Sequence, residues 1–213
     1  MTTNTKVRLR FAKRGDLRLV SHHDLMRCLE RMLRRAQVPM ATTQGFNPRP
    51  RVTFALALGL GIEALREVVD LELAGSMEPA QLLERLVSCA PPGFDWVDAR
   101  ALPPGAGAPR PRSVVYELPV PSPAREAAQA ALPAFLSSAS WPIVRRRADR
   151  LREIDLRPHV LDAELGGDGV LRFRLAVGPD GSARPEELVE ALALGPLLSE
   201  GMYLTRVDVE LDA

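Results

Sequence analysis

The sequence is poor in the residues that mark several common classes of protein. Aromatic residues make up only 5% of the chain, which argues against a sheet that stacks RNA bases on rows of aromatic side chains. The two cysteines, Cys28 and Cys89, stand apart, so we expect reduced thiols and no disulfide framework. No stretch approaches the roughly 18–20 apolar residues of a membrane span.

Signatures of several enzyme classes are also missing. There is no Walker loop, no G-x-G-x-x-G at the start of a helix, no G-x-S-x-G and no C-x-x-C, which argues against the nucleotide-binding, hydrolase and iron–sulfur classes that use them. Of the three histidines, His22 and His23 are consecutive and His159 is remote in sequence, which makes a weak case for zinc. We expect no metal site and no cofactor. The first residues are polar and basic without an apolar region, so we expect no signal peptide and a cytoplasmic protein.

The chain is nonetheless able to form a core, and its charge is unevenly distributed. Its 213 residues are 46% hydrophobic and 26% charged, as in a globular protein of one large or two small domains. Residues 1–51 hold twelve Lys and Arg against three Asp and Glu, a net charge of +9, whereas residues 52–213 carry −8. Such a basic segment attracts polyanions, most simply nucleic-acid phosphates. The alternative is an arginine-rich surface that is merely solvated.

The basic residues are arranged on a predicted helix at residues 21–37. Ser21 suits the N-cap and Asp24 the third helical position of a capping box. One side of the helix is apolar, with Leu25, Leu29, Met32, Leu33 and Ala36. The other side holds Arg27, Arg31, Arg34 and Arg35, with Glu30 beside them, which we interpret as a ridge that binds phosphates or an acidic partner.

The pattern of elements predicts an α+β chain of two tandem ferredoxin-like domains, each in the order βαββαβ. In the first half we expect strands at residues 6–13, 52–58, 67–73 and 94–101, and helices at 21–37 and 78–89; residues 17–20 extend the first strand. In the second half we expect strands or extended segments at residues 114–120, 143–147, 154–165, 170–177 and 203–211, and helices at 123–138 and 185–194. Residues 102–113, with four prolines and two glycines, predict a linker between domains at 1–101 and 114–213.

Further candidate contacts to nucleic acid lie outside the helix. Arg8 and Arg10 alternate with apolar residues in the first strand, which gives that strand a basic outer face. The loop from Gln44 to Arg51 contains Gly45 and Asn47-Pro48, which favour a turn, and its Arg49 and Arg51 project to the same side. Gln44 and Asn47 add amides that can bind base edges or sugar hydroxyls. The alternative is an ordinary loop before a strand with exposed arginines.

A second basic cluster follows in the second half of the chain. It holds Arg145, Arg146, Arg147, Arg150, Arg152 and Arg157. A charged edge strand, which protects a sheet from aggregation, is the competing interpretation for this cluster.

His22, His23 and Asp24 are the catalytic candidates if the chain is an enzyme. Consecutive helical residues point about 100° apart, so these three side chains cannot converge on one metal ion. We expect His22 to lean toward the apolar side as a half-buried residue, and His23 toward the arginines as the better general acid or base.

The stretch from Arg10 to Arg27, together with Arg34-Arg35-Ala36, the Gln44–Pro48 segment and Asp155-Leu156-Arg157-Pro158, resembles the radical SAM-linked protein family, a bacterial domain of unknown function. The resemblance covers almost the whole chain. It implies a gene beside, or fused to, a radical SAM enzyme with a cobalamin-binding domain, and it implies no activity. Leu is usual in that family where His23 stands, which lowers His23 as a catalyst. The family's architecture is also similar to that of CRISPR-repeat-processing endonucleases.

Three functions follow as hypotheses. The first is a non-catalytic accessory protein that binds RNA, such as tRNA or rRNA, and presents it to a radical SAM partner. The second is a metal-independent endoribonuclease that uses His22 or His23 with arginines around the scissile phosphate. The third is a subunit that docks only onto protein.

Overall fold

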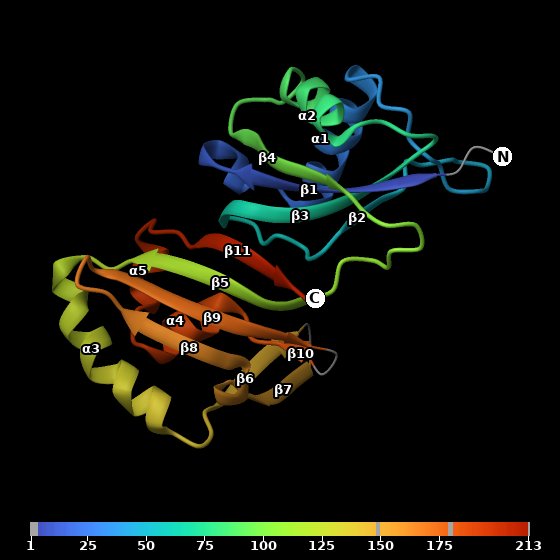
Figure 1. Cartoon of the computed structure of the whole chain (residues 1–213). Helices are drawn as coiled ribbons and strands as arrows, with labels where there is room; N and C mark the ends of the chain where they lie inside the picture. Colours follow the sequence, from blue (N-terminus) through green and yellow to red (C-terminus); the bar gives the residue numbers. More distant parts are fainter. Residues whose placement is uncertain (1–3, 148–149, 179–180, 213) are drawn as a thin grey trace. The chain divides into compact units, whose positions relative to one another are not determined.

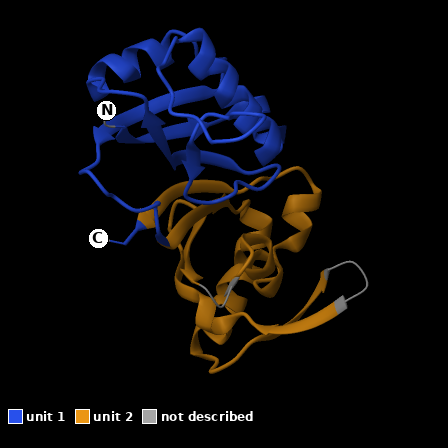
Figure 2. Cartoon of the chain, turned by 90° about the vertical axis from the view of Figure 1, so that its right-hand side faces the viewer, with its two compact units in different colours: residues 1–111, 211–213 blue, residues 112–210 orange. Residues whose placement is uncertain are grey.

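The chain forms two compact units, coloured separately in Figure 2. The computed structural model describes residues 4–147, 150–178 and 181–212. Unit 1 comprises Met1–Pro111 with Leu211–Ala213, and unit 2 comprises Arg112–Glu210. Helices and antiparallel strand pairs occur in both units, which confirms the prediction of an α+β chain.

Unit 1 is a small antiparallel sheet with two helices on one face (Figure 1). The central strand β1 lies between β3 and β4, and β2 pairs with β3. Its elements are β1 (Thr5–Lys13), the 3-10 helix η1 (Gly15–Leu19), α1 (His22–Arg35), β2 (Val52–Phe54), β3 (Glu63–Leu73), α2 (Pro79–Val87) and β4 (Phe94–Ala101).

The core of unit 1 follows from the alternation in β1. Val7, Leu9 and Phe11 are buried on the face that the helices cover, since successive residues of a strand point to opposite faces. Phe11 stacks on Phe94 with ring centroids 4.8 Å apart and meets Phe54 edge-on at 5.9 Å. Leucines of both helices complete this core, among them Leu25, Leu29, Leu82 and Leu86.

Helix α1 begins and ends as the sequence predicts. The backbone N–H of Asp24 donates to Ser21 Oγ at 3.2 Å, and the Ser21 hydroxyl donates to the Asp24 carboxylate at 2.7 Å. Leu25, Leu29, Met32 and Leu33 are the buried residues of the helix. After Ala36 the helix ends at Gln37, whose φ of 52° is left-handed.

Two predictions for unit 1 need correction. Residues 17–20 do not extend β1, because Gly15–Leu19 forms a 3-10 helix. The reason is Lys13, whose buried ammonium group donates to the carbonyls of Arg18 at 3.3 Å and Val20 at 3.1 Å and so curls the chain. The strand predicted at residues 52–58 is shorter, since β2 ends at Phe54.

Unit 2 has more elements than the sequence predicts. Strand β9 lies between β5 and β8, β11 lies beside β5, and β10 pairs with the end of β9. The elements are β5 (Pro111–Pro119), α3 (Ser122–Ser137), β6 (Pro142–Arg147), β7 (Arg150–Asp155), η2 (Arg157–His159), β8 (Val160–Leu165), β9 (Val170–Gly178), β10 (Gly181–Ser182), α4 (Pro185–Ala191), α5 (Gly195–Ser199) and β11 (Thr205–Leu211).

The extended segment predicted at residues 154–165 is in fact broken. Strands β6 and β7 form a separate two-stranded sheet, and a 3-10 turn intervenes before β8. The Asp155 carboxylate causes the break, because it accepts the N–H groups of Trp141 at 2.7 Å and Arg157 at 3.1 Å. Helix α5 was not predicted either. In the part of the chain that the structure describes, no helix is long and apolar enough to cross a membrane.

The aromatic cluster of unit 1 predicts where stability is concentrated. Phe11→Ala is expected to lower the free energy of unfolding by about 3–5 kcal/mol, because it leaves a cavity beside Phe94 and Phe54. Urea denaturation of the two proteins measures the difference. Phe46→Ala is the matched control: Phe46 is fully exposed, so the same chemical change there should alter stability by less than about 0.5 kcal/mol. Equal effects of the two substitutions would contradict this assignment of the core.

Candidate nucleic-acid interface

The arginine ridge of α1, meaning Arg27, Arg31, Arg34 and Arg35, is exposed along its whole length. The apolar side of the helix packs on the sheet, so the helical period places the arginines on the opposite side. Arg27 lies 3.4 Å from Asp24 Oδ1. Within the described residues, the other three side chains form no hydrogen bond or ion pair.

The position of Arg34 and Arg35 also has a purely structural explanation. Both lie in the last turn of α1, where a cation interacts favourably with the helix dipole, typically by about 0.3–1 kcal/mol. That interaction needs one cation at the helix end and does not require Arg31 a turn earlier. The ridge therefore holds more unpaired charge than the helix needs.

Residues 41–51 form a loop whose two sides are joined by hydrogen bonds. The Thr43 N–H donates to the Arg49 carbonyl at 2.9 Å, and the Arg51 N–H donates to the Ala41 carbonyl at 2.8 Å. The Arg49 N–H donates to Thr43 Oγ1 at 3.1 Å. This closure defines the loop's base and leaves Gln44 to Pro48 at its tip.

The tip presents polar and aromatic side chains to solvent. Gln44, Asn47 and Arg49 are exposed, and Phe46 is fully so, with a relative exposure of 106%. Gly45 has a φ of 131°, a conformation that other residues rarely adopt. Sequence reasoning missed Phe46, although its place between Gly45 and Asn47-Pro48, outside any apolar alternation, was a signal of exposure.

The ridge and the loop lie at the same end of the unit 1 sheet. Ala74 N–H donates to the Pro39 carbonyl at 2.7 Å, and Met40 forms a bridge with Leu73, the last residue of β3. Five residues separate Arg35 from Ala41, so their Cα atoms are at most roughly 22 Å apart. One extended ligand can therefore contact both features.

Other predicted contact residues are committed to partners inside unit 1. Arg8 forms a two-pronged ion pair with Asp70 at 2.7 and 3.0 Å, in which Asp70 is only 2% exposed. Arg10 donates to the carbonyl of Arg66 at 3.1 Å. Arg51 donates to the Glu72 carboxylate at 3.1 Å. These three guanidinium groups brace the sheet and its neighbouring loop.

The Arg157 side chain also binds groups within the protein. Its guanidinium group donates to the Val160 carbonyl at 2.8 Å and to the Leu136 carbonyl at 3.1 and 3.3 Å, and it lies 5.8 Å from the centre of the Phe135 ring. In the same cluster, Arg145 forms an ion pair with Glu187 at 2.7 Å. The side chains of Arg147 and Arg150 lie outside the described residues.

His22, His23 and Asp24 do not form a catalytic group in this structure. The His22 ring is half-buried and meets the Phe54 ring edge-on at 5.1 Å, whereas His23 is exposed. The pKa of Asp24 lies below its ordinary value, mainly because the Ser21 hydroxyl donates to the carboxylate. Among the residues described, no group of three potential ligands could hold a metal ion.

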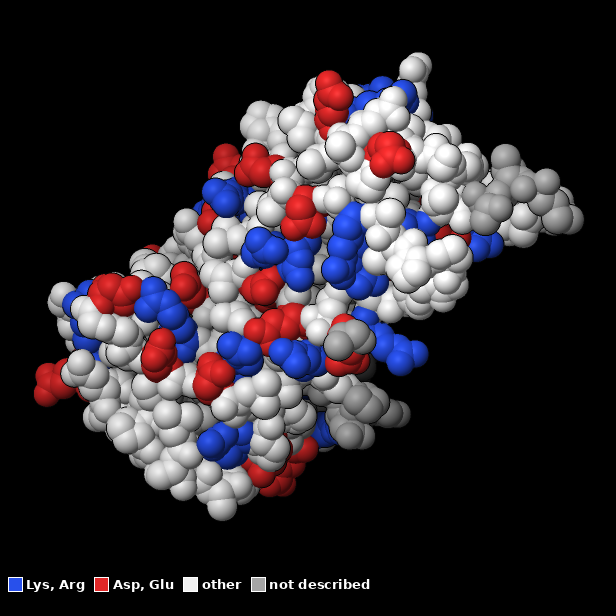
Figure 3. All heavy atoms as spheres, in the orientation of Figure 1, with Lys and Arg blue, Asp and Glu red and all other residues white. Residues whose placement is uncertain are grey.

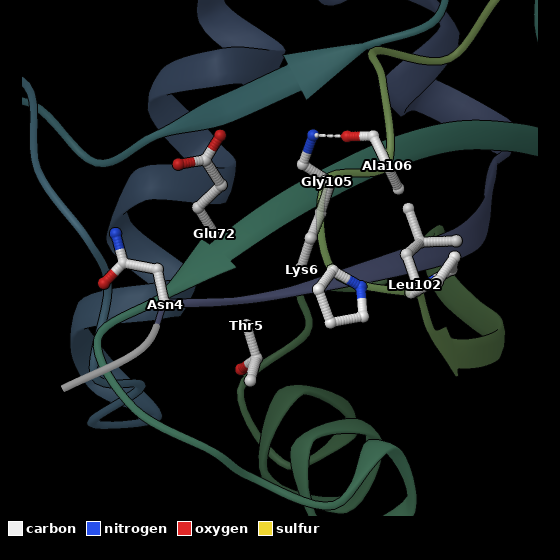
Figure 4. A pocket seen from close by; sticks show the side chains of 9 residues that line it. Asn4, Thr5, Lys6, Glu72, Leu102, Gly105 and Ala106 are labelled. Carbon is white, nitrogen blue, oxygen red and sulfur yellow. Dashed lines mark hydrogen bonds between the residues drawn. The ribbon is translucent and has the colours of Figure 1, made fainter.

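A cavity of about 280 Å³ lies at the start of β1 (Figure 4). Lys6, Glu72 and Ala106 are among its lining residues. The Lys6 ammonium group donates to the Ala106 carbonyl at 2.7 Å, so the cation in this cavity already binds the segment after β4. We assign no ligand to it.

Charges elsewhere on the chain are mixed in sign. On the face seen in Figure 3, Lys and Arg lie among Asp and Glu. In unit 2, Arg172 pairs with Asp168 at 2.7 Å and Arg174 with Glu210 at 2.7 Å. The ridge of α1 differs from these pairs because Arg31, Arg34 and Arg35 form no ion pair or hydrogen bond with a described residue.

Comparison with known proteins assigns the chain to a bacterial family. Residues 6–185 match the family described as "Uncharacterized protein conserved in bacteria (DUF2344)". The chain belongs to this family. The family match covers the ridge, the loop and Arg157, and the description names no activity and no partner.

Other comparisons add little to the family assignment. No curated protein matches the chain. The chain is similar to a solved structure described as an unknown protein from Galdieria sulphuraria, with 14% identity over 99% of this chain and 100% of that one. The TM-score of 0.29 is low, and we draw no conclusion from this likeness.

The N-cap of α1 offers a test of the local geometry that carries the ridge. Ser21→Ala should lower the free energy of unfolding by about 1 kcal/mol and raise the pKa of Asp24 toward its ordinary value. Because the folded-state pKa of Asp24 is depressed, its contribution to stability is present above the unfolded-state pKa. That contribution is lost as pH falls through the folded-state pKa. The difference in unfolding free energy between the wild type and Ser21→Ala should therefore become smaller as the pH falls through this pKa.

NMR titration of the Asp24 carboxyl and urea denaturation at several pH values measure both effects. Ser137→Ala is the control, since that hydroxyl donates only to the Ala134 carbonyl at the end of α3. An unchanged Asp24 pKa in Ser21→Ala would contradict the reciprocal cap.

Proposed function

We propose that this protein is a non-catalytic accessory protein that binds RNA through unit 1 and presents it to a radical SAM partner enzyme in the cytoplasm. The observation that carries the RNA-binding part is the ridge of α1. Arg31, Arg34 and Arg35 are exposed and form no ion pair with a described residue, although Glu30 lies beside them on α1. A cluster of like charges repels itself, and an anionic ligand relieves that repulsion.

The chemistry of the ridge favours phosphate over other anions. A guanidinium group offers a planar fork of donors that matches phosphate oxygens. Residues three and four apart on a helix are neighbours on its surface, with Cβ atoms about 5–6 Å apart, so the ridge offers several forks in a row. Such a row suits a polymer of phosphates better than a single small anion.

The non-catalytic part of the proposal rests on the surroundings of the three catalytic candidates. Asp24 caps α1 and His22 contacts Phe54, which gives each a structural role. His23 is exposed on the first turn of α1. Neither His22 nor Asp24 holds its ring in the fixed orientation that a general base needs. These roles support a protein that holds RNA rather than one that cleaves it.

We also infer that each unit is a ferredoxin-like domain. The linker is shorter than the predicted 102–113, because residues 111–113 already belong to β5. In unit 1 the strands run β4, β1, β3 and β2 across the sheet, and in unit 2 β11, β5, β9 and β8 do so. Both orders place the first strand between the last and the third, as expected for a βαββαβ unit. On this interpretation the β6–β7 hairpin is an insertion.

The partner enzyme is the part of the proposal that rests on sequence resemblance alone. An affinity-tagged chain purified from bacterial cells after ultraviolet crosslinking tests it directly. We expect both a radical SAM enzyme and a defined set of tRNA or rRNA fragments to copurify. Recovery of protein partners without crosslinked RNA would favour a subunit that docks only onto protein.

Replacing three arginines of the ridge should weaken RNA binding without unfolding the protein. Each phosphate contact on a single strand contributes about −0.7 to the slope of log affinity against log salt. The variant Arg31→Gln/Arg34→Gln/Arg35→Gln should therefore reduce the magnitude of that slope by about 2. Fluorescence anisotropy with labelled RNA at several salt concentrations measures it.

The matched control is Arg31→Lys/Arg34→Lys/Arg35→Lys, which keeps the charge at the same positions. This lysine variant should keep most of the slope of log affinity against log salt. Thermal melts establish that all variants are folded. An unchanged slope in the glutamine variant would refute phosphate binding by the ridge.

The purified chain should leave labelled RNA intact, with or without divalent metal ions. His22→Ala should then lower the free energy of unfolding by about 1–3 kcal/mol, because it removes a ring packed edge-on against Phe54. His23→Ala, at an exposed position, should change stability by less than about 0.5 kcal/mol. RNA cleavage that disappears in His22→Ala at an unchanged melting temperature would instead identify an endoribonuclease.

A further inference from the structure

The tip of the loop at residues 41–51 holds an aromatic ring that no intramolecular packing explains. Phe46 has a relative exposure of 106%, which means that the folded chain covers none of it. Burying a Phe side chain is worth about 1.5–3 kcal/mol, and this side chain gains none of that within the described structure. The ring is therefore available to a ligand.

The loop also holds its tip in a defined conformation. The Thr43–Arg49 and Ala41–Arg51 hydrogen bonds close its base, and the Ala41 N–H donates to the Glu72 carbonyl at 2.8 Å, which fastens that base to β3. Pro48 and Pro50 each fix one backbone angle. A backbone restrained on both sides of Phe46 loses less conformational entropy when the ring binds a ligand.

The residues that flank Phe46 in the loop are suited to a nucleotide. Gln44 and Asn47 offer amide donors and acceptors of the kind that pair with base edges, and Arg49 offers donors for a phosphate. Residues 40–51 contain no Asp or Glu, so nothing in the loop repels a polyanion. An apolar protein groove or a lipid surface would call for further apolar side chains beside the ring, whereas the neighbouring exposed residues are polar.

We propose that Phe46 stacks on an unpaired base of the RNA that the α1 ridge holds, with Gln44 and Asn47 at the edge of that base. This proposal rests on the proposed function and specifies its substrate class: RNA with a single-stranded loop, bulge or end. In an A-form duplex the faces of the bases are covered by their neighbours, so an aromatic side chain can stack only on a base that has left the helix.

The distances within unit 1 are compatible with one bound segment. The Cα atoms of Arg35 and Ala41 are at most roughly 22 Å apart, and one strand advances about 3.4 Å per nucleotide. A segment of at most about six nucleotides therefore spans from the ridge to the base of the loop. The ridge supplies sequence-independent phosphate contacts, and the loop selects for an unpaired base.

The test compares single-stranded RNA with a blunt duplex of the same sequence, at one salt concentration, by fluorescence anisotropy. Stacking on an aromatic side chain typically contributes enough that its removal weakens binding between about fivefold and about 150-fold. F46A should show this loss on the single strand and no loss on the duplex. F46W should retain the affinity, and its tryptophan fluorescence should be quenched by the single strand.

Leu60→Ala is the control for loss of an exposed apolar side chain elsewhere in unit 1, where Leu60 is 67% exposed. It should bind both RNAs like the wild type. If F46A binds the single strand as tightly as the wild type while the glutamine variant of the ridge has lost affinity, the stacking proposal fails and the proposed function stands. If the wild type binds neither RNA, both fail.

A parallel experiment separates nucleic acid from a membrane surface. Sedimentation with vesicles of equal parts phosphatidylserine and phosphatidylcholine should recover no protein. Recovery of the wild type but not of F46A with the vesicles would overturn the stacking proposal in favour of insertion into lipid.

Discussion

The arrangement of unit 1 depends on the buried ammonium group of Lys13. It donates to the carbonyls of Arg18 and Val20, and the Arg18 carbonyl also accepts the Gly61 N–H at 2.8 Å. A buried acceptor left without any partner costs about 1–3 kcal/mol. These bonds determine the path of the chain from β1 into α1. Ser21 then stands where it can cap the helix, and the start of the helix sets which residues face the sheet.

The arginine ridge follows from that starting point. Once Leu25 and Leu29 are turned toward β1, the helical period turns Arg27, Arg31 and Arg34 outward. The ridge is thus presented by an element whose other side is anchored in the core. A binding surface on such an element is held in place before its ligand arrives, which lowers the entropic cost of binding.

The basic residues of the first 51 positions fall into two groups. Arg8, Arg10 and Arg51 donate to acceptors within unit 1, and Arg8 with Asp70 is a partly buried pair whose disruption would leave an uncompensated charge. Among the described residues of this segment, the side chains of Arg31, Arg34, Arg35 and Arg49 form no such bond. The net charge of a segment therefore overstates its capacity to bind phosphate, because a guanidinium group that already donates to protein oxygens has few donors left.

Much of the local structure could be predicted from the sequence, because it depends on neighbours along the chain. The alternation of Val7, Leu9 and Phe11 predicted β1, and Ser21 with Asp24 predicted the start of α1 and its exposed arginines. The 3-10 helix after β1 could not be predicted, since it forms only when Lys13 meets the carbonyls of Arg18 and Val20. The role of Arg8 depends on Asp70, which is 62 residues away, and the exposure of Phe46 depends on how the base of its loop is fastened to β3. Local periodicity determined which faces are apolar or basic, and only long-range contacts decided which basic and aromatic side chains stay free to bind.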